Sequence, residues 1–333
     1  CGYAFHDAIG RYKRMTGHPT LLLPGKDHAG IQTESVFTKL LESKGQNKFE
    51  LGREEFYKQC YEFCLTNMNN AREYEQRIGL SADFSREFFT LDPRLTEIVY
   101  STFYKMFEEG LVYRDKRIIN QCPNCHTALA DIDTEHEERR GIFAYIVYPF
   151  VEESDRKKAK ELFGVEGITV ATTRPETMLG DTAVAVNPKD KRYSQFVGKK
   201  VVLPIANREI PVIAEDTTDM ELGTGALKVT PAHSPVDFEI GKKHSLPIVN
   251  VINEEGKMTG SIPERFVGMG TTECSKALCK ELDDLGLLVK IENIKHEVVI
   301  CERCKSAIEP IISNQWYLNV ESLAKRALEA LKR

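Results

Sequence analysis

The stretch CPNCHTALADIDTEHEE, residues 122–138, decides how this chain is organised. Its first two cysteines have the spacing of half a zinc site, because a Cys-x-x-Cys turn presents two thiolates to one tetrahedral ion. The other Cys-x-x-Cys pair, CERC at 301–304, begins 176 residues after Cys125 (301 − 125). Two halves of one site held that far apart would have to meet at the base of an inserted domain.

We predict one structural zinc site formed by Cys122, Cys125, Cys301 and Cys304. Four thiolates leave no open coordination position, so catalysis by this metal is not expected. The alternatives are two unrelated thiol pairs or one redox dithiol, although CPNC lacks the βαβ context of a thioredoxin-like motif. His126 is a spare ligand, but its adjacency to Cys125 makes simultaneous binding awkward.

The composition is that of a globular protein long enough for two or three domains. Of the 333 residues, 41% are hydrophobic and 29% are charged, which excludes a disordered or fibrous chain. The net charge of −5 gives no general attraction for nucleic acid, so such binding would depend on local basic patches such as RYKR (11–14) and RDKR (114–117). The apolar runs are too short to span a bilayer, and no membrane partner is expected.

The cysteine content and the start of the chain bear on its location. Nine cysteines without a framework pattern do not indicate a secreted, disulfide-bonded protein, and no signal peptide opens the chain. We therefore expect a cytoplasmic protein. The chain begins without an initiator Met and already inside a helical pattern, which predicts a fragment of a longer protein.

Segments outside the two cysteine pairs alternate between predicted helices and strands, as in an open α/β unit. Helical spacing predicts helices over 3–15, 31–44, 53–77, 93–110 and 319–332, and apolar runs predict strands over 20–25 and 110–121. After about residue 140 the chain becomes rich in short β-runs divided by Gly, Pro and Asn, such as ITVATTR (168–174), GALKVTPA (225–232) and PIVNVIN (247–253). Helices are expected at about 154–163, 234–244 and 272–286. We predict a mixed, barrel-like β domain here.

Four ordered motifs carry a resemblance to a known family. They are PGKDHAGI (24–31), ATTRPETMLGDTAVAVNP (171–188), GTGALKVTPAHSPVD (223–237) and SNQWYL (313–318). With the cysteine pairs, they resemble a class I aminoacyl-tRNA synthetase of the valine/isoleucine/leucine group over essentially the entire chain. DHAGI after a Pro-Gly turn is similar to the valyl version of this motif.

The resemblance implies an α/β fold in which a partial Rossmann-type catalytic domain is interrupted by a mixed, barrel-like editing domain with a small zinc-ribbon neck. The implied boundaries are 1–118 for the catalytic domain, 119–139 and 297–312 for the neck, 140–296 for the editing domain and 313–333 for the return. The HIGH and KMSKS motifs would be absent, and His6 is not one of the HIGH histidines. The implied partners are tRNA(Val), valine and threonine moieties, and, in the full-length parent only, ATP and Mg; a monomer is expected.

The resemblance also assigns an editing site that hydrolyses threonyl-tRNA(Val). Asp237 would bind the α-ammonium group of the substrate. The other catalytic residues, which would orient the ester and read the threonyl hydroxyl, are Arg174, Lys228 and Thr230, and the substrate-binding residues are Thr172, Thr173, His233 and Ser234. Since no Ser-His-Asp or Cys-His set is evident, we expect direct attack by a positioned water, helped by a ribose hydroxyl of the tRNA.

Simpler interpretations of these residues exist. Thr, Lys and Arg at strand ends are usually solvated, and Asp237 would serve equally as a helix N-cap. Many valyl enzymes carry Asp where this chain has Ser234, which puts the efficiency of editing in doubt.

In the synthetic half, the resemblance implies that Asp27 holds the amino group of valine, that His28 lies beside it, and that Trp316 forms a wall of the valine pocket. A sole Trp is more often part of a core. Lys26 stands where Thr is common in the family.

A second hypothesis treats the chain as a zinc-ribbon module that binds nucleic acid, with a non-catalytic β domain. Basic and aromatic residues around the cysteine pairs would favour it. CPNC is instead followed by the acidic run ADIDTEHEE, which would repel phosphate.

Overall fold

The structure is a computed structural model that describes residues 2–332. The chain divides into two compact units, and the boundaries fall inside two strands, β3 (Val112–Cys122) and β12 (Glu309–Leu318). The first unit runs to Tyr113 and resumes at Tyr317, and the second unit is Arg114–Trp316. Among the helices of residues 2–332, none is both long and apolar enough to cross a membrane.

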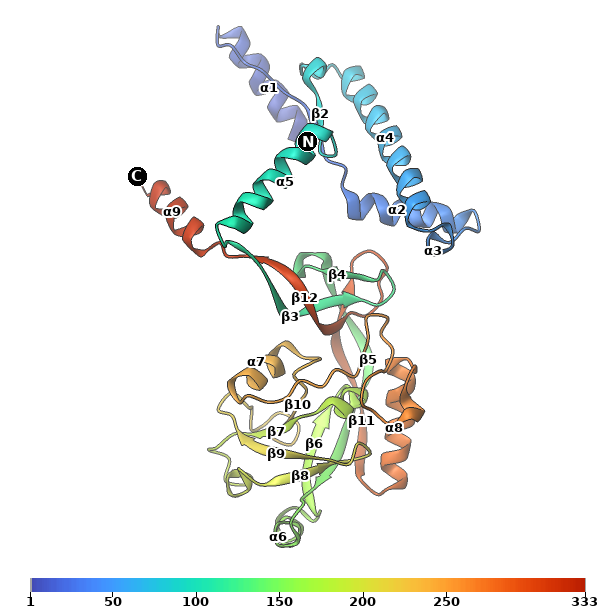
Figure 1. Ribbon diagram of the computed structural model, residues 1–333, viewed down its shortest axis with the longest axis vertical. Helices are drawn as coiled ribbons and strands as arrows, with labels where there is room; N and C mark the ends of the chain where they lie inside the picture. The colour runs from blue at the N-terminus through green and yellow to red at the C-terminus, as the bar shows by residue number, and fades with distance from the viewer. Residues whose placement is uncertain (1, 333) are drawn as a thin grey trace. The chain divides into compact units, whose positions relative to one another are not determined.

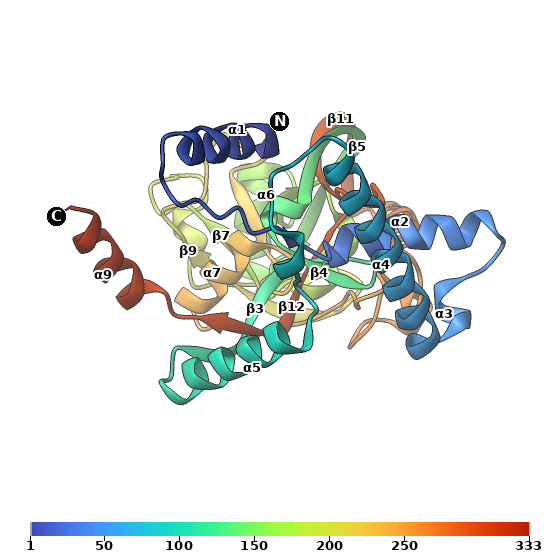
Figure 2. The ribbon, with the colours of Figure 1, turned by 90° about the horizontal axis from the view of Figure 1, so that it is seen from above.

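The first unit is mainly helical (Figures 1 and 2). Its helices are α1 (Gly2–Met15), α2 (Gly30–Ser43), α3 (Lys48–Leu51), α4 (Arg53–Arg77), α5 (Pro93–Glu108) and α9 (Glu321–Leu331), with a 3₁₀ turn at Phe84–Arg86. Phe37 of α2 is buried against Phe56 and Phe63 of α4, with ring centroids 5.6 and 5.4 Å apart. The predicted helices are confirmed, and in α2 and α4 apolar positions at helical spacing face the neighbouring helix.

The predicted strand over 20–25 is wrong. Only its last residue pairs, as part of β1 (Gly25–Lys26), which runs parallel to β2 (Phe88–Phe89). Pro19 and Pro24 lack the N–H that a ladder needs, and Leu21 and Leu23 between them are exposed. In the described part of the first unit, the parallel pairing of a Rossmann-type sheet is therefore limited to this two-residue pair.

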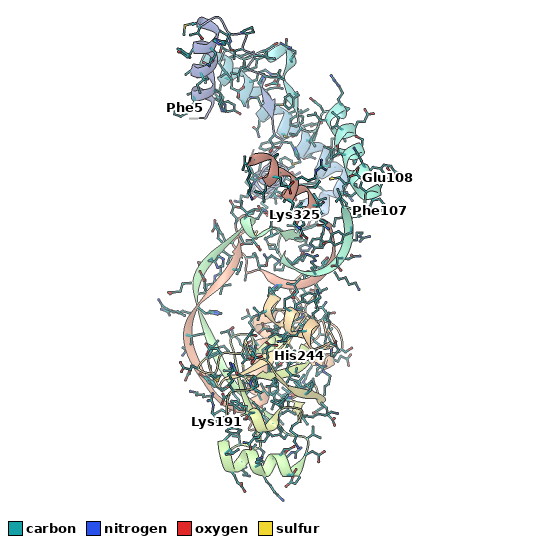
Figure 3. The ribbon with its side chains drawn as sticks, turned by 90° about the vertical axis from the view of Figure 1, so that its left-hand side faces the viewer. Phe5, Phe107, Glu108, Lys191, His244 and Lys325 are labelled. Atoms are coloured by element: carbon teal, nitrogen blue, oxygen red, sulfur yellow. The ribbon has the colours of Figure 1, made fainter. Side chains whose placement is uncertain are left out.

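The second unit is built on three open sheets. The strands other than β3 and β12 are β4 (Thr127–Leu129), β5 (Thr134–Pro149), β6 (Gly167–Thr172), β7 (Ala183–Val186), β8 (Lys200–Leu203), β9 (Arg208–Ala214), β10 (Ala226–Val229) and β11 (Leu288–Cys301). Their orders are β10-β7-β9-β8, β11-β5-β6 and β12-β3-β4. The long antiparallel strands β5 and β11 run side by side as a twisted ribbon (Figure 3).

Three helices and one core complete the second unit. The helices are α6 (Glu153–Phe163), α7 (Pro235–Lys243) and α8 (Thr271–Asp284), and 3₁₀ turns lie at Asp131–Asp133, Pro175–Gly180, Ser194–Phe196 and Glu264–Phe266. The core contains the fully buried side chains of Tyr148, Phe150, Phe196 and Phe266. Phe150 stacks on Phe196 with ring centroids 4.6 Å apart. This core fixes the ends of β6, β7 and β10, where the candidate site lies.

Two expectations for this unit need correction. The barrel-like sheet is not closed: within residues 2–332, β10 pairs only with β7, and beyond β9 the strand β8 makes a single isolated bridge, from Val201 to Phe150. PIVNVIN (247–253) was predicted to be a strand, but only Ile252 makes a bridge, with Met258. The backbone N–H of Val251 instead bonds the ring of His233, which takes this segment out of a ladder.

A charged cluster fixes the C-terminal end of α7. Glu215, directly after β9, is almost completely buried and accepts hydrogen bonds from Lys243 Nζ at 2.9 Å and His244 Nε2 at 3.0 Å. Thr217 Oγ1 donates to the same carboxylate at 3.0 Å. His244 is marked in Figure 3. The Lys243 hydrogen bond is the main cause that lowers the pKa of Glu215 to about 2.

Replacing Glu215 by Gln should therefore destabilise the fold in a pH-dependent way. A carboxyl group with a lowered pKa stabilises the folded state fully above its unfolded pKa, and that contribution disappears as pH falls toward 2. Because Lys243 is more than half exposed, we expect a loss of only about 1–2 kcal/mol at pH 7. Urea unfolding between pH 2 and 7 measures it; Glu209→Gln, which breaks the exposed Lys200 pair, is the control and should cost less than about 0.5 kcal/mol. A penalty that stays constant with pH would contradict this assignment.

Candidate metal centre and active site

The two cysteine pairs meet at one point. The sulfurs of Cys122, Cys125, Cys301 and Cys304 all lie within 4.8 Å of one another, and Cys122 Sγ is 3.4 Å from Cys304 Sγ. Cys122 ends β3 and Cys301 ends β11, so the strands that enter and leave the intervening segment carry the pairs together. The predicted convergence of the pairs is confirmed.

The two cysteine turns have the same backbone geometry. His126 N–H donates to the Cys122 carbonyl, and Lys305 N–H donates to the Cys301 carbonyl, both at 2.9 Å. His126 and Lys305 both have left-handed φ angles, 55° and 59°. Two matched turns of this kind direct four sulfurs inward, and His126 is not part of the group that could hold a metal.

The cysteines of the cluster differ in their pKa values. Burial raises the pKa of Cys122 to about 11, whereas hydrogen bonds from Ser306 overcome burial and lower the pKa of Cys304 to about 6. Leu129 and Ile308 close the apolar side of the cluster. Four clustered thiols with these neighbours can hold a metal ion as thiolates.

Lys228 is the centre of a buried polar network. Its ammonium group donates to Thr230 Oγ1 at 2.7 Å, Thr177 Oγ1 at 2.8 Å and Asp181 Oδ1 at 3.3 Å. As predicted from their spacing in the strand, Lys228 and Thr230 project toward the same place. The three hydrogen bonds use all three ammonium protons, so the position of Lys228 is tightly defined.

Asp181 is the acidic partner in this network. Its carboxylate is completely buried and accepts from Tyr148 Oη at 2.7 Å and Thr230 Oγ1 at 2.5 Å, in addition to Lys228. Burial raises the pKa of Asp181 to about 6, although Lys228 and Thr230 act in the opposite direction. Arg208 further fixes the segment by donating to the Asp181 carbonyl at 2.8 Å.

Asp237 and Ser234 lie at the start of α7. Ser234 is the N-cap and accepts from the Asp237 N–H at 3.3 Å, so the interpretation of Asp237 as the N-cap is wrong. The Asp237 carboxylate accepts the Thr230 N–H at 2.8 Å, which joins α7 to the end of β10. Burial raises the pKa of Asp237 above its usual range, against the effect of Lys228.

Arg174 lies between two carboxylates. Its Nε donates to Glu176 at 3.0 Å, and its Nη2 pairs with Glu309 of β12. Burial opposes the charge, but Glu309 and Glu176 together raise the pKa of Arg174. The Arg174 carbonyl accepts from Thr177 Oγ1 at 3.0 Å, which connects this ion cluster to the Lys228 network.

His233 uses both ring nitrogens on the backbone. Nε2 accepts the Val251 N–H at 3.0 Å, so the Nδ1 proton donates to the Pro310 carbonyl at 3.1 Å. Burial lowers the pKa of His233 to about 4. A neutral ring held in this way supports the turn before α7 and has no ring nitrogen left for substrate.

The threonines of the TTR segment differ in exposure. Thr172 is buried and accepts the Arg174 N–H at 3.0 Å, which shapes the turn after β6. Thr173 is partly exposed, and the Arg174 side chain is 30% exposed. Substrate therefore has access to Thr173 and Arg174 in preference to Thr172.

The predicted synthetic residues divide between the units. In the first unit, His28 Nδ1 lies 2.6 Å from Thr90 Oγ1 and 3.4 Å from the exposed Asp27 carboxylate. His28 also lines a cavity of about 770 Å³ between α2 and α4. Trp316 belongs to the second unit and is half exposed, with the Arg114 guanidinium 5.4 Å from its ring.

Lys26 points into a buried ion cluster. Its ammonium pairs with Glu75 of α4 and lies 3.8 Å from Glu87, which also pairs with Arg72. The side chain of Lys26 is nearly buried. Lys26 thus has structural partners within the first unit.

Asp181, Thr177 and Glu309 were not predicted from the sequence. The first two lie within one of the quoted motifs, and Asp181 was detectable as an acid two residues before an apolar strand. The antiparallel register pairs Ala183 with Val229, so the residues before Ala183 lie beside those after Val229. Glu309 carried no signal, because its partner is 135 residues away in the chain.

The sequence that forms these units matches one known family over nearly its whole length. The chain belongs to the class I tRNA synthetases (I, L, M and V), whose family model matches residues 2–333. Among its relatives is the valine–tRNA ligase of Treponema denticola, 44% identical over 328 residues that cover 98% of this chain. The valine–tRNA ligases of Clostridium acetobutylicum and Geobacter sulfurreducens are each 46% identical, over 99% and 98% of this chain. The chain spans about a third of the length of these relatives, 36% of each.

Proposed function

We propose that this chain is part of a cytoplasmic valine–tRNA ligase and that its second unit hydrolyses mischarged threonyl-tRNA(Val). The supporting observation for the ligase is the similarity to valine–tRNA ligases across nearly the whole chain. The protein would attach valine to tRNA(Val) using ATP and Mg. We assign residues 140–296 to the editing domain and the segments around the cysteines to its neck.

Such an enzyme needs a second site because valine and threonine have nearly the same shape. A hydrophobic pocket that binds valine rejects threonine by only about a hundredfold, and this pair of amino acids is the standard example of that limit. A site that hydrogen-bonds the threonyl hydroxyl discriminates in the opposite sense, since valine would leave its buried polar groups unpaired.

The polar network around Lys228 is the observation that supports hydrolytic editing. A substrate hydroxyl would take the place of one of the three hydrogen bonds that Lys228 makes in the absence of substrate, and Asp181 balances the buried ammonium charge. Asp237 supplies a carboxylate for the α-ammonium group. Arg174, partly exposed beside this network, would orient the ester.

The proposed reaction is hydrolysis of the aminoacyl ester. A water oxygen adds to the ester carbonyl carbon and loses a proton, and the bond from that carbon to the ribose oxygen breaks. The ribose oxygen takes up a proton, which yields free threonine and tRNA. The protein contributes mainly orientation and fixed hydrogen-bond donors near the developing oxyanion.

Deacylation of threonyl-tRNA(Val) by the purified protein tests this proposal. We expect release of threonine well above the rate in buffer. Binding of intact tRNA without deacylation would overturn the hydrolase and would favour the alternative, a zinc-ribbon module that binds nucleic acid.

We further propose that the cysteine centre holds one structural zinc ion. The ion would bind Cys122, Cys125, Cys301 and Cys304 and close the base of the inserted domain, an arrangement that stabilises the fold by restricting the unfolded chain. When bound, zinc supplies this structural cross-link.

Metal analysis of the purified protein should find about one zinc per chain. Cys301→Ser removes one of four thiolates and should lower zinc content severalfold and the melting temperature with it. Cys279→Ser, at a buried cysteine outside the cluster, is the control and should retain zinc. Equal zinc content in all three proteins, or none in the parent, would contradict the site.

A further inference from the structure

The residue before β12 and the first two residues of β12 contact the cysteine cluster and the candidate active site. Ile308 packs in the small core around Cys122 and Cys301. Glu309 pairs with Arg174, and the Pro310 carbonyl accepts the Nδ1 proton of His233 at 3.1 Å. The strand that leaves the second cysteine turn therefore supports two elements of the site.

Glu309 is unlike the other partner of Arg174. Glu176 is two residues along the same turn, so it moves with Arg174 and cannot fix the guanidinium relative to other elements. Glu309 comes from β12 and is buried, with a side chain only 9% exposed. Its pairing with Nη2, together with that of Glu176 with Nε, holds the planar guanidinium at two points.

Burying the Glu309 carboxylate costs free energy. Burial raises its pKa above the usual range, while Arg174 lowers it. Replacing a buried ion pair by apolar residues is often neutral or stabilising, so stability alone is a weak reason for such a pair. The pair does, however, fix an arginine that is one of the partly exposed members of the site.

We propose that Glu309 is a positioning residue for the hydrolytic reaction, which acts by holding the Arg174 guanidinium in the orientation that the ester requires. This inference rests on the proposed editing function. Glu309 does not touch the reacting atoms. Without its charge, Arg174 keeps only Glu176 and gains freedom to turn away from the ester.

A double-mutant cycle on threonyl-tRNA(Val) hydrolysis tests the proposal. Glu309→Gln preserves size and removes charge, and should lower kcat by about tenfold with KM changed by less than about twofold, because a misplaced group costs rate in the bound complex. Glu309→Asp keeps the charge and should recover most of the lost kcat. In an Arg174→Gln background, Glu309→Gln should have no further effect, since the group through which it acts is gone.

Controls separate the possible failures. Glu254→Gln removes an exposed charge from the turn that precedes Gly256 and should leave kcat unchanged. Equal activity of Glu309→Gln and the parent, or an equal loss in both Arg174 backgrounds, would overturn the positioning role. If Glu309→Gln fails to fold, the same cycle is run with Glu309→Met, an apolar residue of similar volume, and an equal loss in both Arg174 backgrounds would again overturn the positioning role. A parent protein that leaves threonyl-tRNA(Val) intact would instead overturn the proposed function, and this inference with it.

Discussion

Replacing Asp237 by Asn is expected to slow hydrolysis of threonyl-tRNA(Val) by about 30- to 100-fold while the fold is retained. A hydrogen bond from an ammonium group to a carboxylate contributes about 2–3 kcal/mol when it is shielded from water, and Asn supplies no charge. The Asn side-chain oxygen still accepts the Thr230 N–H, so the junction of β10 and α7 is preserved.

Single-turnover deacylation and thermal unfolding measure the two parts of this prediction. Asp237→Ala should also lose activity, but it leaves the Thr230 N–H without an acceptor and should cost about 1–3 kcal/mol of stability. Glu239→Gln is the matched control, because it neutralises an exposed acid two residues further along α7. Unchanged turnover of Asp237→Asn would show that the α-ammonium group is held elsewhere.

Replacing Lys228 by Met should destabilise the second unit by about 3 kcal/mol, because it leaves the Asp181 carboxylate buried without its cation. With Lys228 present, burial already raises the pKa of Asp181 to about 6, and loss of the ammonium raises it further. A carboxyl group with a raised pKa favours the folded state less as pH rises from its unfolded pKa to its folded pKa. The penalty should therefore be smaller at pH 5 than at pH 8.

The double variant Lys228→Met/Asp181→Asn removes both charges and should recover part of the lost stability. Lys200→Met, which breaks an exposed pair with Glu209, should change the free energy of unfolding by less than about 0.5 kcal/mol. Chemical denaturation at pH 5 and pH 8 measures all three proteins. A Lys228→Met penalty as small as that of Lys200→Met would mean that the network is not the buried core of the site.

The parts of the fold that could be predicted from the sequence are those specified by local pattern. The apolar spacing of α4 and the Pro at the first position of α5 and α7 identify helices without knowledge of their partners. The cysteine pairs could be predicted to converge because the chemistry of tetrahedral ligation needs four sulfurs together.

The features that the sequence did not predict depend on contacts between segments far apart in the chain. TLLLPG and PIVNVIN both have a strand-like composition. Prolines prevent the first from pairing as a strand, and in the second the hydrogen bond from the Val251 N–H to the His233 ring replaces a strand hydrogen bond. The open sheets were unpredictable for the same reason, since edge strands β8 and β10 differ from interior strands only in their neighbours.

In the candidate site too, some residues could be predicted from local sequence and others depend on long-range contacts. Lys228 and Thr230 could be placed on one face from their spacing, whereas Asp237 was assigned through the family resemblance. Asp181 and Glu309 reach the site through the β7–β10 register and through β12, which no short stretch of sequence encodes. The assigned roles of all these residues remain predictions for the experiments above.

The most direct test of the proposed editing function compares the hydrolysis of threonyl-tRNA(Val) and valyl-tRNA(Val) by the same purified protein. If the Lys228 network reads the substrate hydroxyl, kcat/KM for the threonyl ester should exceed that for the valyl ester by at least about a hundredfold. Equal hydrolysis of the two esters, or of neither, would contradict the proposed function.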